Sequence, residues 1–409
     1  MKTLGTILKR IIRNVHYSTI ESTAKPTNWN LSRAIYQQIQ TSGPISVADY
    51  MKLVLTHPSG GYYMHKEAIG EEGDFITSPE ISQLFGEMIA VWLINEWRKM
   101  GSPKPFQIVE LGPGKGSLSA DILRVFNYFK IDQTELRLVE VSPRLRRAQA
   151  DRLGVKVDMD QFEKGTTDKN ITVNWHRHLN EVPRKFSLFV AHEFFDALPV
   201  HKFHKTDAGY REILIDIDKS SVKDQPMFRY ILARNPTPMQ VLLDSNEARH
   251  DVEISPESVL LYKDICERIK TDGGVALICD YGHFGGDIDS FRAFKNHQQV
   301  HPLNEPGSSD LTADVDFRAI TKVADDVQGV LTFGPVTQRD FLLRTGLDVR
   351  VDSLKQTLKD AEQLENIDKC FDYLTNNSKM GERFKFMAIL PETMKPILDV
   401  HPVVGFTNQ

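Results

Sequence analysis

The chain has 409 residues, and its 50 Lys and Arg against 55 Asp and Glu give a formal net charge of −5. This acidic balance argues against a partner with a phosphate backbone, so we expect no nucleic acid. The three cysteines are widely spaced and form no C-x-x-C pair, which argues against a disulfide framework and a zinc site. No apolar run is long enough to span a bilayer.

The first twenty residues differ from the rest of the chain. Six apolar residues fall on one helical face with basic residues around them, and no acid occurs before Glu21. This pattern predicts a mitochondrial transit peptide over 1–20, although an ordinary surface helix is the alternative. Removing it would leave 46 basic against 55 acidic residues, a net charge of −9.

Residues 28–101 are expected to form a helical, lid-like region. The pattern predicts two helices within 30–56, a mobile glycine-rich passage from Gly60 to Phe75, and one helix from Ser78 to Gly101. Ser78 and Pro79 are typical of a helix start, and the glycine of a helix end. This region could close over a ligand.

The stretch from Phe106 to Ser119 predicts a strand, a glycine turn and a helix. A short apolar run with β-branched residues fits a buried parallel strand. Gly112, Gly114 and Gly116 follow at alternate positions, where a missing Cβ lets backbone N–H groups approach a ligand. Apolar residues then recur at helical spacing. The stretch is typical of a nucleotide-binding turn.

The spacing of the three glycines indicates which nucleotide the turn binds. The third glycine comes too early for a dinucleotide fingerprint, and no Gly-Lys-Ser/Thr closes a P-loop. An acid before the glycines, Glu110, instead suits the ammonium group of S-adenosylmethionine. Glu140 ends the next predicted strand, 136–141, and is placed to accept hydrogen bonds from ribose hydroxyls. A tight connection without a ligand is the alternative, but two carboxylates at adjacent strand ends would then repel each other.

A second group of polar residues follows the predicted strand 186–191. Glu193 and Asp196 should stand beyond the carboxyl end of the sheet, where open parallel sheets bind their substrates. Asp196 occupies the second histidine position of H-E-x-x-H, so a zinc site is not expected. Paired carboxylates suit a guanidinium, and we expect both residues to be catalytic. The alternative is that two acids merely favour a helix dipole.

The remaining elements complete an α/β fold. A β-rich insertion is expected near 205–255, then a helix over 256–269, a strand over 275–279 ending at Asp280, and late strands over 329–333 and 384–390. The loop 306–316 is expected to be irregular and to line the substrate mouth. The alternation predicts a seven-stranded, Rossmann-like class I S-adenosylmethionine-dependent methyltransferase domain over 102–391, with a tail over 392–409.

Five motifs, in order along the chain, resemble the MidA-like family: Gly73-Asp-Phe-Ile-Thr-Ser-Pro-Glu, Glu110-Leu-Gly-Pro-Gly-Lys-Gly, His192-Glu-Phe-Phe-Asp-Ala-Leu-Pro, Asp280-Tyr-Gly-His and Asp310-Leu-Thr-Ala-Asp-Val-Asp-Phe. The resemblance implies a protein arginine methyltransferase of the mitochondrial matrix. Its implied substrate is a core subunit of the peripheral arm of complex I, methylated symmetrically during assembly. The family's glycine motif carries over onto Gly112, Gly114 and Gly116, whereas Glu193 and Asp196 depend on the argument from residues. A small-molecule methyltransferase and a non-catalytic assembly chaperone stay open as alternatives.

Overall fold

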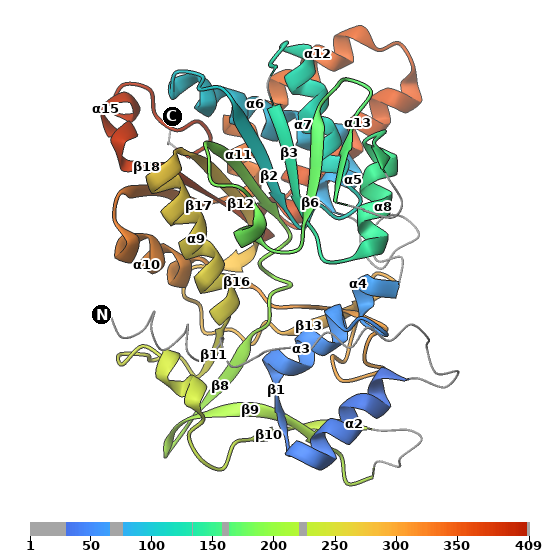
Figure 1. Ribbon diagram of the computed structural model, residues 1–409, viewed down its shortest axis with the longest axis vertical. Coiled ribbons are helices and arrows are strands. Elements are labelled where there is room, and N and C mark those ends of the chain that lie inside the picture. The colour runs from blue at the N-terminus through green and yellow to red at the C-terminus, as the bar shows by residue number, and fades with distance from the viewer. Residues whose placement is uncertain (1–29, 66–76, 133, 158–162, 221–226, 407–409) are drawn as a thin grey trace.

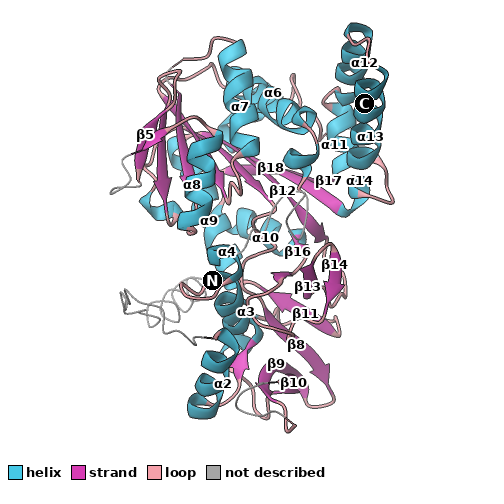
Figure 2. Cartoon of the chain, turned by 90° about the vertical axis from the view of Figure 1, so that its right-hand side faces the viewer, coloured by secondary structure: helices cyan, strands magenta, loops and turns pink. Residues whose placement is uncertain are grey.

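The computed structural model describes residues 30–65, 77–132, 134–157, 163–220 and 227–406 (Figure 1). The predicted transit peptide and the predicted glycine passage from residue 66 to Phe75 lie outside these ranges. Within them, every helix is too short or too polar to cross a membrane. The described chain forms a large open sheet covered by helices, and below it a smaller part built from helices and short sheets (Figures 1 and 2).

The large sheet has the order β17-β18-β12-β7-β2-β3-β6-β5-β4, with β16 paired to β12. Its centre is parallel and comprises β2 (Phe106–Leu111), β3 (Thr134–Val139), β6 (Thr172–His176), β7 (Ser187–His192) and β12 (Gly274–His283). Two antiparallel strands follow, β17 (Val330–Thr337) and β18 (Phe384–Pro391). Because the central strands are parallel, their carboxyl ends share one edge of the sheet.

The strand count differs from the predicted seven, because the described residues place ten strands in this sheet. The additional strands are β4 (Lys156–Val157), β5 (Lys164–Thr166) and β16 (Val315–Asp316). Each has two or three residues, so none carries the apolar run by which a buried strand is recognised in a sequence.

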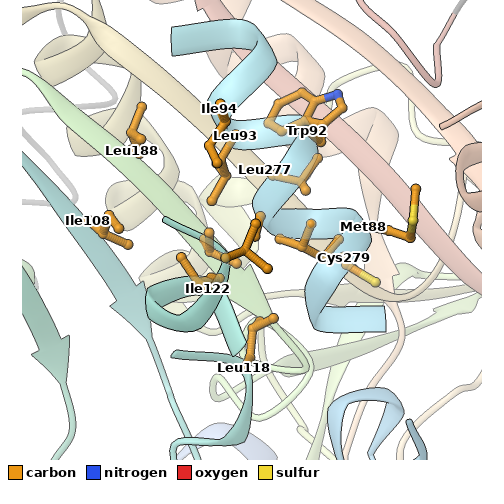
Figure 3. Close-up of a cluster of buried hydrophobic side chains, with 14 of the residues drawn as sticks. Met88, Trp92, Leu93, Ile94, Ile108, Leu118, Ile122, Leu188, Leu277 and Cys279 are labelled. Atoms are coloured by element: carbon orange, nitrogen blue, oxygen red, sulfur yellow. The ribbon is translucent and has the colours of Figure 1, made fainter. Parts of the chain in front are cut away.

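Helices cover both faces of the sheet. Alternate residues of the strands point to opposite sides, so Ile108 joins the cluster under α6 and α7, whereas Val109 joins the cluster under α9 and α10. Figure 3 shows side chains of α6 and α7 packed on β2, β7 and β12. These helices are α6 (Gln83–Lys99), α7 (Ser117–Tyr128), α9 (Pro256–Asp272) and α10 (Phe317–Val327).

Further helices surround the sheet. They are α8 (Pro143–Arg152), η1 (Leu179–Glu181), α11 (Gln338–Arg344), α12 (Leu347–Thr357), α13 (Ala361–Thr375), α14 (Met380–Arg383), η3 (Glu392–Met394) and α15 (Lys395–Leu398).

The helix predicted from Ser78 to Gly101 is interrupted. Ser82 is extended, with φ of −157°, and separates α5 (Ser78–Ile81) from α6. Its hydroxyl accepts a hydrogen bond from the N–H of Leu84 at 3.2 Å and so caps α6. The prediction of one helix was therefore wrong, because the apolar spacing continues across a residue that starts a second helix.

The smaller part brings together three regions distant in sequence. The first is N-terminal: α2 (Leu31–Ser42), β1 (Ile45–Ser46), α3 (Val47–Thr56) and α4 (Tyr62–His65). The second is the inserted segment, with β8 (His201–Thr206), β9 (Gly209–Ile217), β10 (Phe228–Leu232), η2 (Pro238–Leu242) and β11 (Asp251–Ile254). The third follows β12, with β13 (Arg292–Lys295), β14 (Gln298–Val300) and β15 (Asp310–Thr312).

These regions share one hydrophobic cluster, which includes Ile35, Tyr50, Ile215 and Leu311. The predicted irregular loop 306–316 belongs partly to this core. Asp310 lies in β15 and is buried, and its carboxylate accepts a hydrogen bond from the Tyr63 hydroxyl at 2.8 Å. The prediction of an irregular loop was wrong for residues 310–312, which form this buried strand, because buried partners satisfy its polar groups.

Candidate active site

A pocket of about 600 Å³ lies at the carboxyl ends of β2, β3 and β7. Its walls include the turns that follow these strands and residues of α3 and α9. Five predicted site residues line it: Glu110, Gly112, Gly114, Glu140 and Glu193. The pocket is where a twisted parallel sheet is expected to bind a ligand.

The glycine turn between β2 and α7 has backbone angles that favour glycine. The φ angles of Gly112, Gly114 and Gly116 are 64°, 53° and 85°. A Cβ on Gly112 would lie 2.5 Å from Cδ2 of Phe194, and one on Gly116 would lie 3.3 Å from Cα of Gln149. Gly116 is the N-cap of α7 and lies outside the pocket lining, so its role is to let α8 approach the turn.

Glu110 and Glu140 are buried carboxylates in the pocket wall. Glu110 accepts a hydrogen bond from the Ser119 hydroxyl, and burial raises its pKa to about 7. Glu140 accepts from the N–H of Ser142 at 2.8 Å, and burial likewise raises its pKa to about 7. Within the described chain Glu110 forms no ion pair. A cationic ligand would therefore favour its charged form.

Glu193 follows β7 in a left-handed backbone conformation, with φ of 49°. Its side chain is 8% exposed, and its carboxylate accepts a hydrogen bond from the N–H of Ser78. Among the described residues, neither Oε1 of Glu193 nor Nε2 of His192, 3.5 Å away, has a hydrogen-bond partner. Burial, and after it the charge of Asp196, raises the pKa of Glu193 well above its usual range. The pocket wall thus includes a residue whose carboxylate has one buried oxygen without a hydrogen-bond partner among the described residues.

Asp196 occupies the same turn but is absent from the pocket wall. Its carboxylate accepts a hydrogen bond from the Thr312 hydroxyl at 2.8 Å, and burial raises its pKa to about 6. The structure therefore brings Glu193 and Asp196 close together, with Glu193 alone of the two in the wall of the pocket.

A profile of the family described as "Putative S-adenosyl-L-methionine-dependent methyltransferase" matches residues 88–336. The chain belongs to this methyltransferase family. It is 47% identical over 398 residues to the Drosophila melanogaster protein arginine methyltransferase NDUFAF7 homolog, mitochondrial, covering 94% of this chain and 90% of that protein. The human protein arginine methyltransferase NDUFAF7, mitochondrial, is 42% identical over 393 residues, covering 93% and 88%.

The methyltransferase also resembles a solved structure, a Burkholderia thailandensis protein with bound S-adenosyl-homocysteine. The TM-score is 0.74 at 22% identity, covering 92% of each chain. This likeness shows that the two proteins share a fold. The cofactor of the family is S-adenosylmethionine, and the pocket fits it: Gly112 and Gly114 expose backbone without side chains in its wall, and buried Glu110 is without a cationic partner in the described chain.

Two residues and one segment at the pocket of the methyltransferase were not predicted from the sequence. Gln149 on α8 donates to the carbonyl of Gly114 at 2.7 Å and to Glu140 at 3.2 Å, and so ties the glycine turn to the second carboxylate. Nothing in its local sequence signals this role. The segment 177–180 after β6 also lines the pocket, which the strand order could have indicated.

The second of these residues is Glu80, which lines the pocket from α5. Its carboxylate accepts a hydrogen bond from the hydroxyl of Ser117, the first residue of α7. Ser78 and Pro79 predict the helix start, but an acid in the first turn of a helix gives no local signal that it lines a pocket.

Proposed function

We propose that this methyltransferase transfers a methyl group to an arginine of a protein. Relatives named protein arginine methyltransferase, at 42–47% identity over most of the chain, support this class of acceptor. The observation that carries the proposal is the carboxylate of Glu193, buried in the pocket wall with one oxygen unpartnered among the described residues. A guanidinium is always charged and carries several N–H donors, so it suits this acceptor.

The proposed mechanism assigns separate tasks to the two groups of pocket residues. S-adenosylmethionine supplies an electrophilic methyl group on its sulfonium. Glu110, Glu140 and the backbone of the glycine turn bind and orient the cofactor. Glu193 accepts N–H groups of the arginine, orients one nitrogen toward the methyl group and takes up the proton that this nitrogen loses. Alignment of this kind can supply on the order of 7–11 kcal/mol.

The electrostatics of Glu193 favour a cationic acceptor over a neutral one. In the free protein, burial disfavours its charged form. A guanidinium beside it lowers the pKa again, so that binding of arginine creates the carboxylate that orients it. A neutral small molecule would offer no such compensation. Asp196, on the same turn, adds to the effect of burial, because its charge also raises the pKa of Glu193.

The resemblance to the MidA-like family supports a finer proposal. The substrate is a core subunit of the peripheral arm of complex I, and its arginine is dimethylated symmetrically during assembly of the complex. Relatives are named mitochondrial, and the basic segment 1–20 supports import into the matrix.

The test combines tritiated S-adenosylmethionine, the purified chain and an extract of mitochondria that lack this protein. After acid hydrolysis, we expect the label in methylated arginine. Glu193→Gln should lower the rate by about 100-fold or more, the scale of losing a general base and an orienting charge. Calorimetric binding of S-adenosylmethionine should persist in this variant.

Glu96→Gln is the matched control, because Glu96 is a buried carboxylate on α6 outside the pocket wall. It should turn over like the wild type. Label in lysine or in a small molecule, or full turnover by Glu193→Gln, would contradict the proposal. Cofactor binding without any methyl transfer would instead favour a non-catalytic assembly chaperone.

A further inference from the structure

The motif Asp280-Tyr-Gly-His has no part in the mechanism above. Asp280 lies on β12 one residue beyond Cys279, which pairs with His192 at the end of β7. It is fully buried and absent from the pocket wall. We propose that Asp280 is a positioning residue, which holds the turn 193–196 so that Glu193 and Phe194 face the pocket. This inference rests on the proposed function of Glu193.

The hydrogen bonds of Asp280 converge on that turn. One oxygen, Oδ2, accepts the backbone N–H groups of Phe194 at 3.1 Å, Phe195 at 2.9 Å and Asp196 at 3.3 Å. The other oxygen accepts the N–H of Tyr281 at 2.9 Å. Three consecutive N–H groups on one oxygen fix the direction of the chain at this turn. Burial, and after it the charges of Asp196 and Glu193, raises the pKa of Asp280, whereas the N–H groups of Phe195 and Asp196 lower it.

The turn is bound to β12 at a fourth point as well. The N–H of Glu193 donates to the carbonyl of Cys279 at 3.0 Å. All four N–H groups from 193 to 196 are therefore held by two adjacent residues of one strand. Because β12 lies beside β7 in the middle of the sheet, this anchor is rigid.

This anchoring matters because the turn has a conformation that glutamate seldom adopts. Glu193 has a φ of 49°, and such angles persist only where the surroundings enforce them. The next residue, Phe194, places its ring where a Cβ on Gly112 would otherwise extend. One buried carboxylate thus sets the position of the proposed catalytic acid and of the ring that covers the cofactor turn.

A direct catalytic role for Asp280 fits the structure less well. Its side chain has no access to the pocket, and both oxygens are already occupied by backbone donors. Asp280 therefore acts through the turn and touches neither cofactor nor substrate.

Asp280→Asn tests this role, since the amide keeps the shape but turns an NH₂ group toward a backbone donor. The chain offers a matched control in Asp316→Asn. Oδ1 of Asp316 also accepts three backbone N–H groups, from Gly285 at 3.1 Å, Arg318 at 3.0 Å and Ala319 at 3.3 Å, but outside the pocket wall. Asp280→Ser, which is smaller and cannot overpack the site, serves as a second variant if the first does not fold.

Two measurements are made on each variant of the full chain. Hydrogen exchange follows the amides of 193–198, and methyl transfer in the extract assay is expressed per molecule able to bind S-adenosyl-homocysteine. In Asp280→Asn we expect faster exchange at these amides and a kcat lower by about tenfold or more, as loss of a buried hydrogen bond that positions Glu193 predicts. The KM for S-adenosylmethionine should change by less than about threefold. Asp316→Asn should show neither effect.

The outcomes separate this inference from the proposed function. If Asp280→Asn matches Asp316→Asn in both measurements, Asp280 only stabilises the fold and the inference is wrong. If exchange rises but kcat per binding-competent molecule is unchanged, the turn is anchored without consequence for catalysis, and the inference is again wrong. If Glu193→Gln keeps full turnover, the proposed role of Glu193 fails, and the exchange measurement shows separately whether Asp280 anchors the turn.

Discussion

At the scale of single residues, Gly112 is a pocket position that should tolerate a side chain poorly. It combines a positive φ of 64° with a Cβ site only 2.5 Å from the Phe194 ring. Gly346 has a similar backbone, with φ of 92°, but nothing within 4 Å of its Cβ site. The two glycines therefore separate the cost of backbone strain from the cost of a steric clash.

We expect Gly112→Ala to weaken binding of S-adenosylmethionine by about tenfold and to destabilise the fold by about 1–3 kcal/mol, because the Phe194 ring must move. Gly346→Ala should cost about 1 kcal/mol and leave binding unchanged. Calorimetric titration and urea unfolding provide the two measurements. Equal effects of both substitutions on binding would mean that contact with the Phe194 ring does not make Gly112 sensitive to a side chain.

The buried carboxylates make cofactor binding depend on pH. Burial raises the pKa of Glu110 and of Glu140 to about 7, above the value of about 4.3 in an unfolded chain. Between these values the folded state binds more protons than the unfolded state, so stability of the free protein falls as pH rises through this window. A cationic ligand favours ionised Glu110, so affinity should rise as pH increases toward 7 and then level off.

This pH dependence is measured by calorimetry in buffers of different ionisation enthalpy, which also counts the protons released on binding. Glu110→Gln should flatten the dependence in part, and Glu110→Gln combined with Glu140→Gln should remove it. An affinity that is independent of pH in the wild type would show that both carboxylates are already ionised in the free protein.

At the scale of helices and strands, the sequence was informative wherever one local pattern decides the outcome. The apolar runs at β2, β7 and β12 and the glycine spacing before α7 predicted elements that the structure contains. Patterns failed where local preferences compete. Ser82 interrupts an otherwise regular helical spacing, and Asp310 is a charged residue whose buried strand depends on Tyr63, 247 positions away.

The candidate site was predictable to a similar extent and for the same reason. Glu110, Glu140 and Glu193 end strands that share one edge of the sheet, so spacing and topology sufficed to place them in the pocket wall. Gln149 was unpredictable because its role depends on how α8 packs against the glycine turn. The orientation of Asp196 away from the pocket likewise depends on Thr312, in a strand far along the chain.

At the scale of the whole molecule, the pocket joins two parts with separate hydrophobic clusters. Leu55 and Thr56 of α3 line it from the smaller part, and Leu260 of α9 and the glycine turn line it from the larger part. An ion pair between Lys52 and Glu257, 2.9 Å long, also connects α3 to α9. Both side chains of this pair are about 40% exposed, so solvent weakens their attraction. A ligand that touches both walls should connect the two parts more strongly than this pair does.

Saturation with S-adenosyl-homocysteine is therefore expected to slow hydrogen exchange in α3 as well as in the glycine turn. At a concentration about 100 times Kd, mass action should stabilise the folded molecule by about 2.7 kcal/mol. If the two parts unfold separately without ligand, their transitions should move closer together when it is added. The peptide covering α2 is the internal control, because α2 belongs to the smaller part but contributes nothing to the pocket wall. Slower exchange in the glycine turn with no change in α3 would show that the larger part binds the cofactor without help from the smaller one.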